Sequence, residues 1–99
     1  MKRGNSPDKV KSDLVELYDK SAESYDLEYQ TSAGRYFMMG KIKTALDLGG
    51  FNKGDNILEV GCANGVYTFE FARMGFDMTG LDLSPKNIEV AKERAKNEH

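Results

Sequence analysis

The sequence predicts an α/β fold in which strands and helices alternate over the second half of the chain. Asn56–Val60 and Phe76–Asp82 are short apolar runs typical of buried strands, and each is followed by a helical pattern. These helices are expected over Val66–Met74 and over Pro85–Asn97, the latter after the helix-start signal Ser84-Pro85. Strands that alternate with helices in this way pair in parallel through right-handed crossovers.

Residues 1–50 are predicted to form a helical cap region, and residues 51–99 form the α/β unit. The pair Ser6-Pro7 is typical of a helix start, because serine caps a helix and proline suits its first position. Apolar side chains follow at helical spacing: Val10, Leu14, Leu17 and Tyr18. This segment is either one helix or two helices with a break near Ser21–Ser24.

A second helix is predicted to begin at Thr31 or Ser32 and to end at Gly49-Gly50. Its apolar stripe is expected to comprise Met38, Ile42, Ala45 and Leu46. In the helix that follows the first strand, Phe69 and Ala72 are expected to point inward.

The residues that predict a ligand site follow the two strands, at the edge where α/β folds bind their ligands. Gly61–Gly65 forms the turn after the first strand, and Gly61 lets a ligand approach the backbone closely. Gly65 stands at the helix start, where a side chain would obstruct either a ligand or the contact between helix and strand. Asp82 ends the next strand, 21 residues after Gly61, and its carboxylate can accept hydrogen bonds from a ribose diol.

The spacing of the glycines distinguishes between S-adenosylmethionine and nucleotide cofactors that carry phosphates. The loop reads G-x-A-x-G rather than the G-x-G-x-x-G of dinucleotide sites, and the chain has no G-x-x-x-x-G-K-[ST] phosphate loop. Glu59, two residues before Gly61, would repel a pyrophosphate and would suit a ligand with a cationic end. S-adenosylmethionine has an ammonium, a sulfonium and a ribose but no phosphate, so it is the predicted cofactor. An NAD-type half-domain is the alternative.

The segment ILEVGCANGVYTFEFARMGFDMTGLDLSPKNIEVAKERA resembles motif I, and the strand and helix after it, of class I S-adenosylmethionine-dependent methyltransferases of type 11/25. YDKSAESYD, ahead of it, is similar to the N-terminal helical cap of these enzymes. The resemblance covers about residues 55–96 and implies the N-terminal half of a Rossmann-like fold with methyltransferase activity. Ala63 departs from the pattern, since many members have glycine there. The residues that the resemblance places around the cofactor are Glu59, Gly61, Ala63 and Gly65 at the methionine side, with Cys62 beside them, Asp82 at the ribose, Leu83 at the adenine, and Tyr18 or Tyr25 as a cover.

Several of these residues have a purely structural alternative. On that interpretation the glycines form a tight turn, Asp82 supports the start of the last helix, and the tyrosines pack between helices. Cys62 is expected to be a small loop residue rather than a nucleophile, because the single histidine, His99, lies at the chain end. Arg35 is expected to have a surface role rather than to meet the cofactor carboxylate. No catalytic residue and no metal site is predicted.

By the resemblance, the sheet is incomplete, and the strands that would hold the adenine amine and face the methyl acceptor are not among these residues. No acceptor is therefore predicted. Ile57, Leu58 and Val60 are expected to lack cover on the face opposite the helices, and unpaired strand edges invite self-association. The alternative to an enzyme is a non-catalytic module that binds S-adenosylmethionine or S-adenosylhomocysteine, or that interacts through its sheet edge.

The composition predicts a protein that binds neither nucleic acid nor membranes. Fourteen basic and sixteen acidic residues give a net charge of −2, so no strong positive field attracts phosphates or anionic lipids. The sequence has no apolar run of about 18 residues and no secretory signal. Cys62 is the only cysteine, which excludes an intrachain disulfide and favours the reducing cytoplasm.

Overall fold

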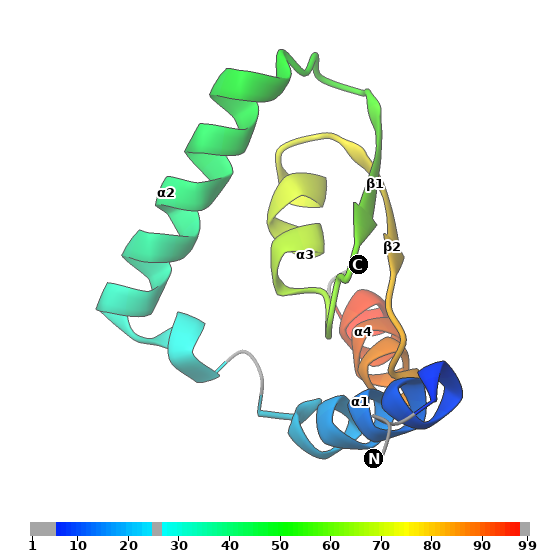
Figure 1. The fold of residues 1–99 in the computed structure, drawn as a ribbon. Helices are drawn as coiled ribbons and strands as arrows, with labels where there is room; N and C mark the ends of the chain where they lie inside the picture. The colour runs from blue at the N-terminus through cyan, green and yellow to red at the C-terminus, as the bar shows by residue number, and fades with distance from the viewer. Residues whose placement is uncertain (1–5, 25–26, 98–99) are drawn as a thin grey trace.

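The computed structural model describes residues 6–24 and 27–97, and it shows two parallel strands with helices on one face (Figure 1). The predicted α/β order is confirmed, with strand, helix, strand and helix following a helical N-terminal region. Tyr25, one of the predicted cofactor contacts, lies outside the described residues. In chain order the elements are α1 (Pro7–Ser21), the 3-10 helix η1 (Leu27–Gln30), α2 (Ser32–Gly49), β1 (Asn56–Val60), α3 (Val66–Arg73), β2 (Asp77–Leu81) and α4 (Pro85–Asn97).

The N-terminal helices begin and end at local signals. The side chains of Ser6 and Thr31 each accept a hydrogen bond from a backbone N–H of the first helical turn, at 3.2 and 3.0 Å. Gly50 ends α2 in the left-handed conformation, with φ of 63°. Because α1 ends at Ser21, the interpretation with a helix break is confirmed over that of one continuous helix.

The two strands pair in parallel and in register, so that Val60 lies opposite Leu81 at their carboxyl ends. Ile57 and Glu59 are half-buried on the face that α3 covers, whereas Leu58 and Val60 are exposed on the other face. The exposed fraction of Val60 is 77%. The prediction of a bare face is therefore right for Leu58 and Val60 and wrong for Ile57, because successive side chains of a strand point to opposite faces.

The apolar core is small and lies mainly between α2 and α3. Its buried members are Met38 and Ile42 of α2 and Val66 of α3. The predictions that Ala45 and Ala72 face inward are wrong, since both residues are exposed. Ala45 lies at the edge of the α2 stripe. Ala72 follows a buried position of α3 by two residues, or about 200° of helical rotation, which turns it away from the core.

Helix α1 contacts α4 and contributes no apolar residue to the core. The apolar side chains predicted at helical spacing all remain exposed: Val10, Leu14, Leu17 and Tyr18. The position of α1 therefore depends on polar contacts with the residues around the start of α4.

Two kinds of feature are absent from residues 6–24 and 27–97. No helix in these ranges combines the length and the apolar character that a membrane crossing requires. No group of three or more His, Cys, Asp or Glu side chains in them is placed to hold a metal ion.

Candidate cofactor site

The loop between β1 and α3 is tied to the end of β2. The backbone N–H groups of Gly61 and Cys62 both donate to the carbonyl oxygen of Leu81, at 2.7 and 2.9 Å. The loop has positive φ angles at Gly61 (77°), Ala63 (51°) and Gly65 (90°). Glycine adopts this conformation freely, but alanine is strained in it, and such strain persists only where surrounding contacts hold the residue.

Gly61 and Gly65 have different surroundings. A Cβ atom at Gly61 would meet nothing within 4 Å, whereas one at Gly65 would lie 2.7 Å from Cε2 of Phe69. Gly65 therefore permits close packing inside α3, and Gly61 leaves its backbone open to a ligand. Gly80 of β2 has a role that the sequence did not reveal. A Cβ atom there would lie 2.8 Å from Sγ of Cys62, so Gly80 makes room for that side chain.

The carboxylate of Asp82 connects the loop to the start of α4. Its Oδ1 accepts a hydrogen bond from the backbone N–H of Ala63 at 3.1 Å. Its Oδ2 accepts from the backbone N–H of Ser84 at 3.0 Å and from Nδ2 of Asn87 at 3.3 Å. A carboxylate has about four acceptor positions, so these three bonds leave room for a hydroxyl group of a ligand.

A cavity of about 610 Å³ opens beside this carboxylate, at the carboxyl ends of both strands. Its volume is in the range of about 300–1,000 Å³ that is typical of small-molecule sites. Five residues from the sequence-based set line it: Tyr18, Gly61, Ala63, Asp82 and Leu83. Three further residues complete the lining: Val60, Leu81 and Asn87.

Glu59, Cys62 and Gly65 are not among the residues that line this cavity. Glu59 faces α3, where its Oε1 accepts a hydrogen bond from the hydroxyl of Thr68, and burial raises the pKa of its carboxyl group. Cys62 is buried. Burial, and then the charges of Asp82 and Glu59, raise the pKa of its thiol, so the environment disfavours the nucleophilic thiolate.

Asn87 lies in the cavity wall and supports the carboxylate of Asp82. It is 1% exposed, and its Nδ2 must face Asp82 because a carboxylate can only accept. Its Oδ1 is buried and has no partner within the described part of the chain. The carboxylate that Asn87 supports suits a neutral or cationic ligand such as S-adenosylmethionine.

Asp19 of α1, which the sequence did not single out, contacts the residues around the start of α4. Its Oδ1 accepts hydrogen bonds from the hydroxyl of Ser84 and from the backbone N–H of Lys86, the latter at 3.1 Å. Nearby, Nδ2 of Asn64 in the loop donates to the carbonyl oxygen of Ala22 at 2.8 Å. The start of α4 and the glycine loop thus both hold the C-terminal end of α1. The pairing of Asp19 with Ser84 spans 65 residues and has no local sequence signal.

Comparison with known proteins places the α/β unit in a family. A family model described as a methyltransferase domain matches residues 51–99. Over 87 residues, the chain is 28% identical to the demethylmenaquinone methyltransferase of Tropheryma whipplei (strain Twist), covering 86% of this chain and 35% of that protein. It is 49% identical over 43 residues to a ubiquinone biosynthesis O-methyltransferase of Azorhizobium caulinodans, covering 43% of this chain and 17% of the relative.

A third relative is the magnesium-protoporphyrin O-methyltransferase of Rhodobacter capsulatus, which is 42% identical over 41 residues, or 41% of this chain and 18% of the relative. The chain spans about a third or less of the length of these curated relatives. The match to the family model includes the glycine loop and Asp82. Residues 51–99 therefore form part of an S-adenosylmethionine-dependent methyltransferase domain.

Proposed function

We propose that the chain binds S-adenosylmethionine in the cavity beside Asp82 and supplies the cofactor-binding part of a methyltransferase. The observation that carries this proposal is the carboxylate of Asp82 in the cavity wall, whose three hydrogen bonds leave an acceptor position for a ligand. A ribose diol presents hydroxyl donors to such a carboxylate. The carboxylate also disfavours a phosphate at the same wall, which supports this cofactor over a dinucleotide.

We assign the other lining residues the roles that the resemblance to methyltransferases implies. Gly61 and Ala63 present backbone to the methionine end, and Leu83 offers an apolar surface to the adenine ring. Tyr18, from α1, covers the ligand. Bound S-adenosylmethionine supplies an already activated methyl group, so the chain contributes orientation of the donor and exclusion of water.

Isothermal titration calorimetry with S-adenosylmethionine, S-adenosylhomocysteine and NAD tests the proposal. We expect heat with the two sulfur compounds and none with NAD. Replacing Asp82 by alanine should weaken the affinity by roughly tenfold or more, as loss of a charged acceptor does. Asp77→Ala, at the exposed opposite end of β2, is the matched control and should leave the affinity unchanged. A folded wild-type chain that gives no heat with either sulfur compound would refute the proposal.

A second proposal concerns interaction through the uncovered face of the sheet. Leu58, Val60 and Leu81 are all more than half exposed there, which supports self-association as a way to bury them. Size-exclusion chromatography with light scattering tests it, with Leu58→Lys as the variant because Leu58 does not line the cofactor cavity. We expect the substitution to lower the observed mass. A wild-type chain that elutes as a monomer at high concentration contradicts this proposal.

We also propose a cytoplasmic location. It is supported by the single cysteine, which is buried and can form no intrachain disulfide, as is usual in a reducing compartment. Fractionation of cells that express a tagged protein tests it, with recovery in the membrane or secreted fraction as the contradicting result.

A further inference from the structure

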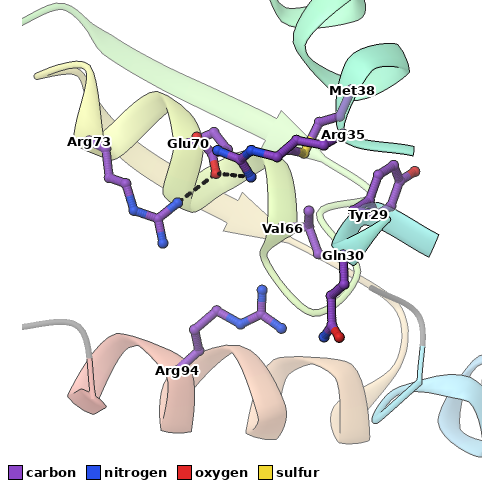
Figure 2. Close-up of a pocket in the computed structure, with 8 residues that line it drawn as sticks. All are labelled: Tyr29, Gln30, Arg35, Met38, Val66, Glu70, Arg73 and Arg94. Carbon is purple, nitrogen blue, oxygen red and sulfur yellow. Dashed lines mark hydrogen bonds and ion pairs between the residues drawn. The ribbon is translucent and has the colours of Figure 1, made fainter. Parts of the chain in front are cut away.

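Two carboxylates of the fold are held by donors of different kinds. Glu70 of α3 lies beside two arginines (Figure 2), and its Oε1 accepts hydrogen bonds from Nη1 of Arg73 at 2.7 Å and from Nη1 of Arg35 at 3.4 Å. Within the described part of the chain, the donors to Asp82 are all neutral: two backbone N–H groups and one side-chain amide. Neutral donors orient a carboxylate without cancelling its charge, so Asp82 keeps that charge for a ligand.

The donors to Asp82 are divided unequally between its two oxygens. Oδ1 accepts from the backbone N–H of Ala63 at 3.1 Å. Oδ2 accepts two bonds, from the backbone N–H of Ser84 at 3.0 Å and from Nδ2 of Asn87 at 3.3 Å. Each oxygen has about two acceptor positions, so Oδ2 is filled and the open position lies on Oδ1. Asn87 is the side chain that completes Oδ2, and it thereby leaves Oδ1 to the ligand.

Asn87 is itself fixed in the first turn of α4. Its backbone N–H donates to Oγ of Ser84 at 3.0 Å, and the hydroxyl of Ser84 donates to Oδ1 of Asp19 on α1. Asn87 lines the cofactor cavity although only 1% of the residue is exposed. A side chain that is buried and whose backbone is held in this way has little freedom to change its rotamer. The amide therefore offers Asp82 a donor in a fixed place.

We propose that Asn87 is a positioning residue for ribose recognition, whose amide holds Asp82 in the orientation in which the carboxylate accepts from the ribose hydroxyls. This inference rests on the proposed binding of S-adenosylmethionine beside Asp82. Without the amide, Oδ2 regains an open acceptor position and the carboxylate is free to turn, so the ribose hydroxyls lose a preorganised partner. An asparagine that only supported the fold would leave the contribution of these hydroxyls to binding unchanged.

Calorimetric titration with S-adenosylhomocysteine and with its 2′,3′-dideoxy analogue measures that contribution as a ratio of two affinities. For the wild type, we expect the analogue to bind roughly tenfold or more weakly, because Asp82 loses the hydroxyl donors. In Asn87→Ala the ratio should fall below about threefold, since changes at two partners of one interaction are not additive. A loss of stability alone weakens the binding of both ligands by the same factor and leaves the ratio unchanged.

A second variant keeps the test decisive if Asn87→Ala does not fold. Asn87→Leu keeps the branched shape of the side chain and removes the amide donor, together with the buried Oδ1 that has no partner in the described part of the chain. It should lower the ratio as alanine does. Asn97→Ala is the matched control, because it removes the same kind of side chain at the exposed end of α4 and should keep the wild-type ratio. Urea unfolding confirms that each titrated variant is folded.

The results separate a failure of this inference from a failure of the proposed function. A high wild-type ratio that falls in the folded Asn87 variants, but not in Asn97→Ala, supports the positioning role. A high wild-type ratio that persists in folded Asn87→Leu refutes the positioning role and leaves the proposed function standing. Equal affinities of the wild type for the two ligands would mean that Asp82 does not hold the ribose hydroxyls, so the role proposed for Asp82 fails and this inference fails with it.

Discussion

The backbone N–H of Ala63 donates a hydrogen bond to Oδ1 of Asp82 across 3.1 Å. Among the described residues, Ala63 is the one non-glycine residue with a positive φ angle. The bond to Asp82 therefore holds the strained backbone of Ala63 in place. Asp82 also lines the cofactor cavity. One carboxylate therefore supports the loop and faces the cavity, so the proposed binding site and the stability of the loop depend on the same residue.

Replacing Asp82 by alanine should lower the free energy of unfolding by about 1–3 kcal/mol, because three backbone or side-chain donors lose their acceptor. Asp82→Asn keeps one acceptor oxygen and should cost less. Urea unfolding followed by circular dichroism measures both effects. Asp77→Ala serves as the control, and an equal loss in that variant contradicts the assigned role.

Alanine at Gly61 and at Gly65 should have different main effects. Both substitutions strain a positive φ angle, but Gly65→Ala also places a Cβ atom against the Phe69 ring, so it should lower the free energy of unfolding more than Gly61→Ala. Gly61→Ala adds a methyl group in open space beside the cavity and should chiefly weaken the affinity for S-adenosylmethionine. Urea unfolding and calorimetry on the two variants give the comparison. The reverse order of stability would be inconsistent with the structure.

Replacing Asp19 by asparagine should loosen α1 from α4. The variant loses the charged acceptor of Ser84 and Lys86, and α1 buries no residue that would hold it in place. We expect faster amide hydrogen exchange within α1, with α2 and α3 unchanged. Asp13→Asn is a matched control, because Asp13 pairs only with exposed Lys9 on the same helix among the contacts described. Equal exchange in both variants would disprove the anchoring role.

Glu59 should make stability depend on pH. Burial raises its folded-state pKa above the ordinary value of 4.5, so the unfolded chain releases the proton at lower pH than the folded chain does. The stability of the wild type relative to Glu59→Gln should therefore fall as pH rises from about 4.5 through the raised pKa, and stay lower above it. Urea midpoints of both proteins at about pH 4 and about pH 7 measure this difference. A stability difference between the two proteins that is the same at both pH values would contradict this prediction.

The parts of the fold that the sequence predicted are those with local signals. Ser6, Thr31 and Gly50 mark helix ends through contacts within four residues. The spacing of Gly61 and Asp82 likewise predicted two strand ends that meet at one edge, because parallel pairing brings carboxyl ends together.

The unpredicted parts depend on contacts between distant segments. The bond from Ser84 to Asp19 and the ion pair of Arg35 with Glu70 join residues that are 65 and 35 positions apart in the sequence. Local residue spacing gives no signal for such pairs. Ala72 shows the same limit, since its apolar character suggested burial although it is exposed in the structure.

The carbonyl oxygen of Leu81 accepts both N–H groups at the start of the glycine loop. This double attachment makes the loop and the end of β2 move together, so the floor of the cavity keeps its shape between binding events. With the proposed cofactor in this cavity, its exchange depends on movement of α1, whose Tyr18 also lines the cavity. We therefore expect the residence time of the cofactor to depend on the rate at which this one helix moves.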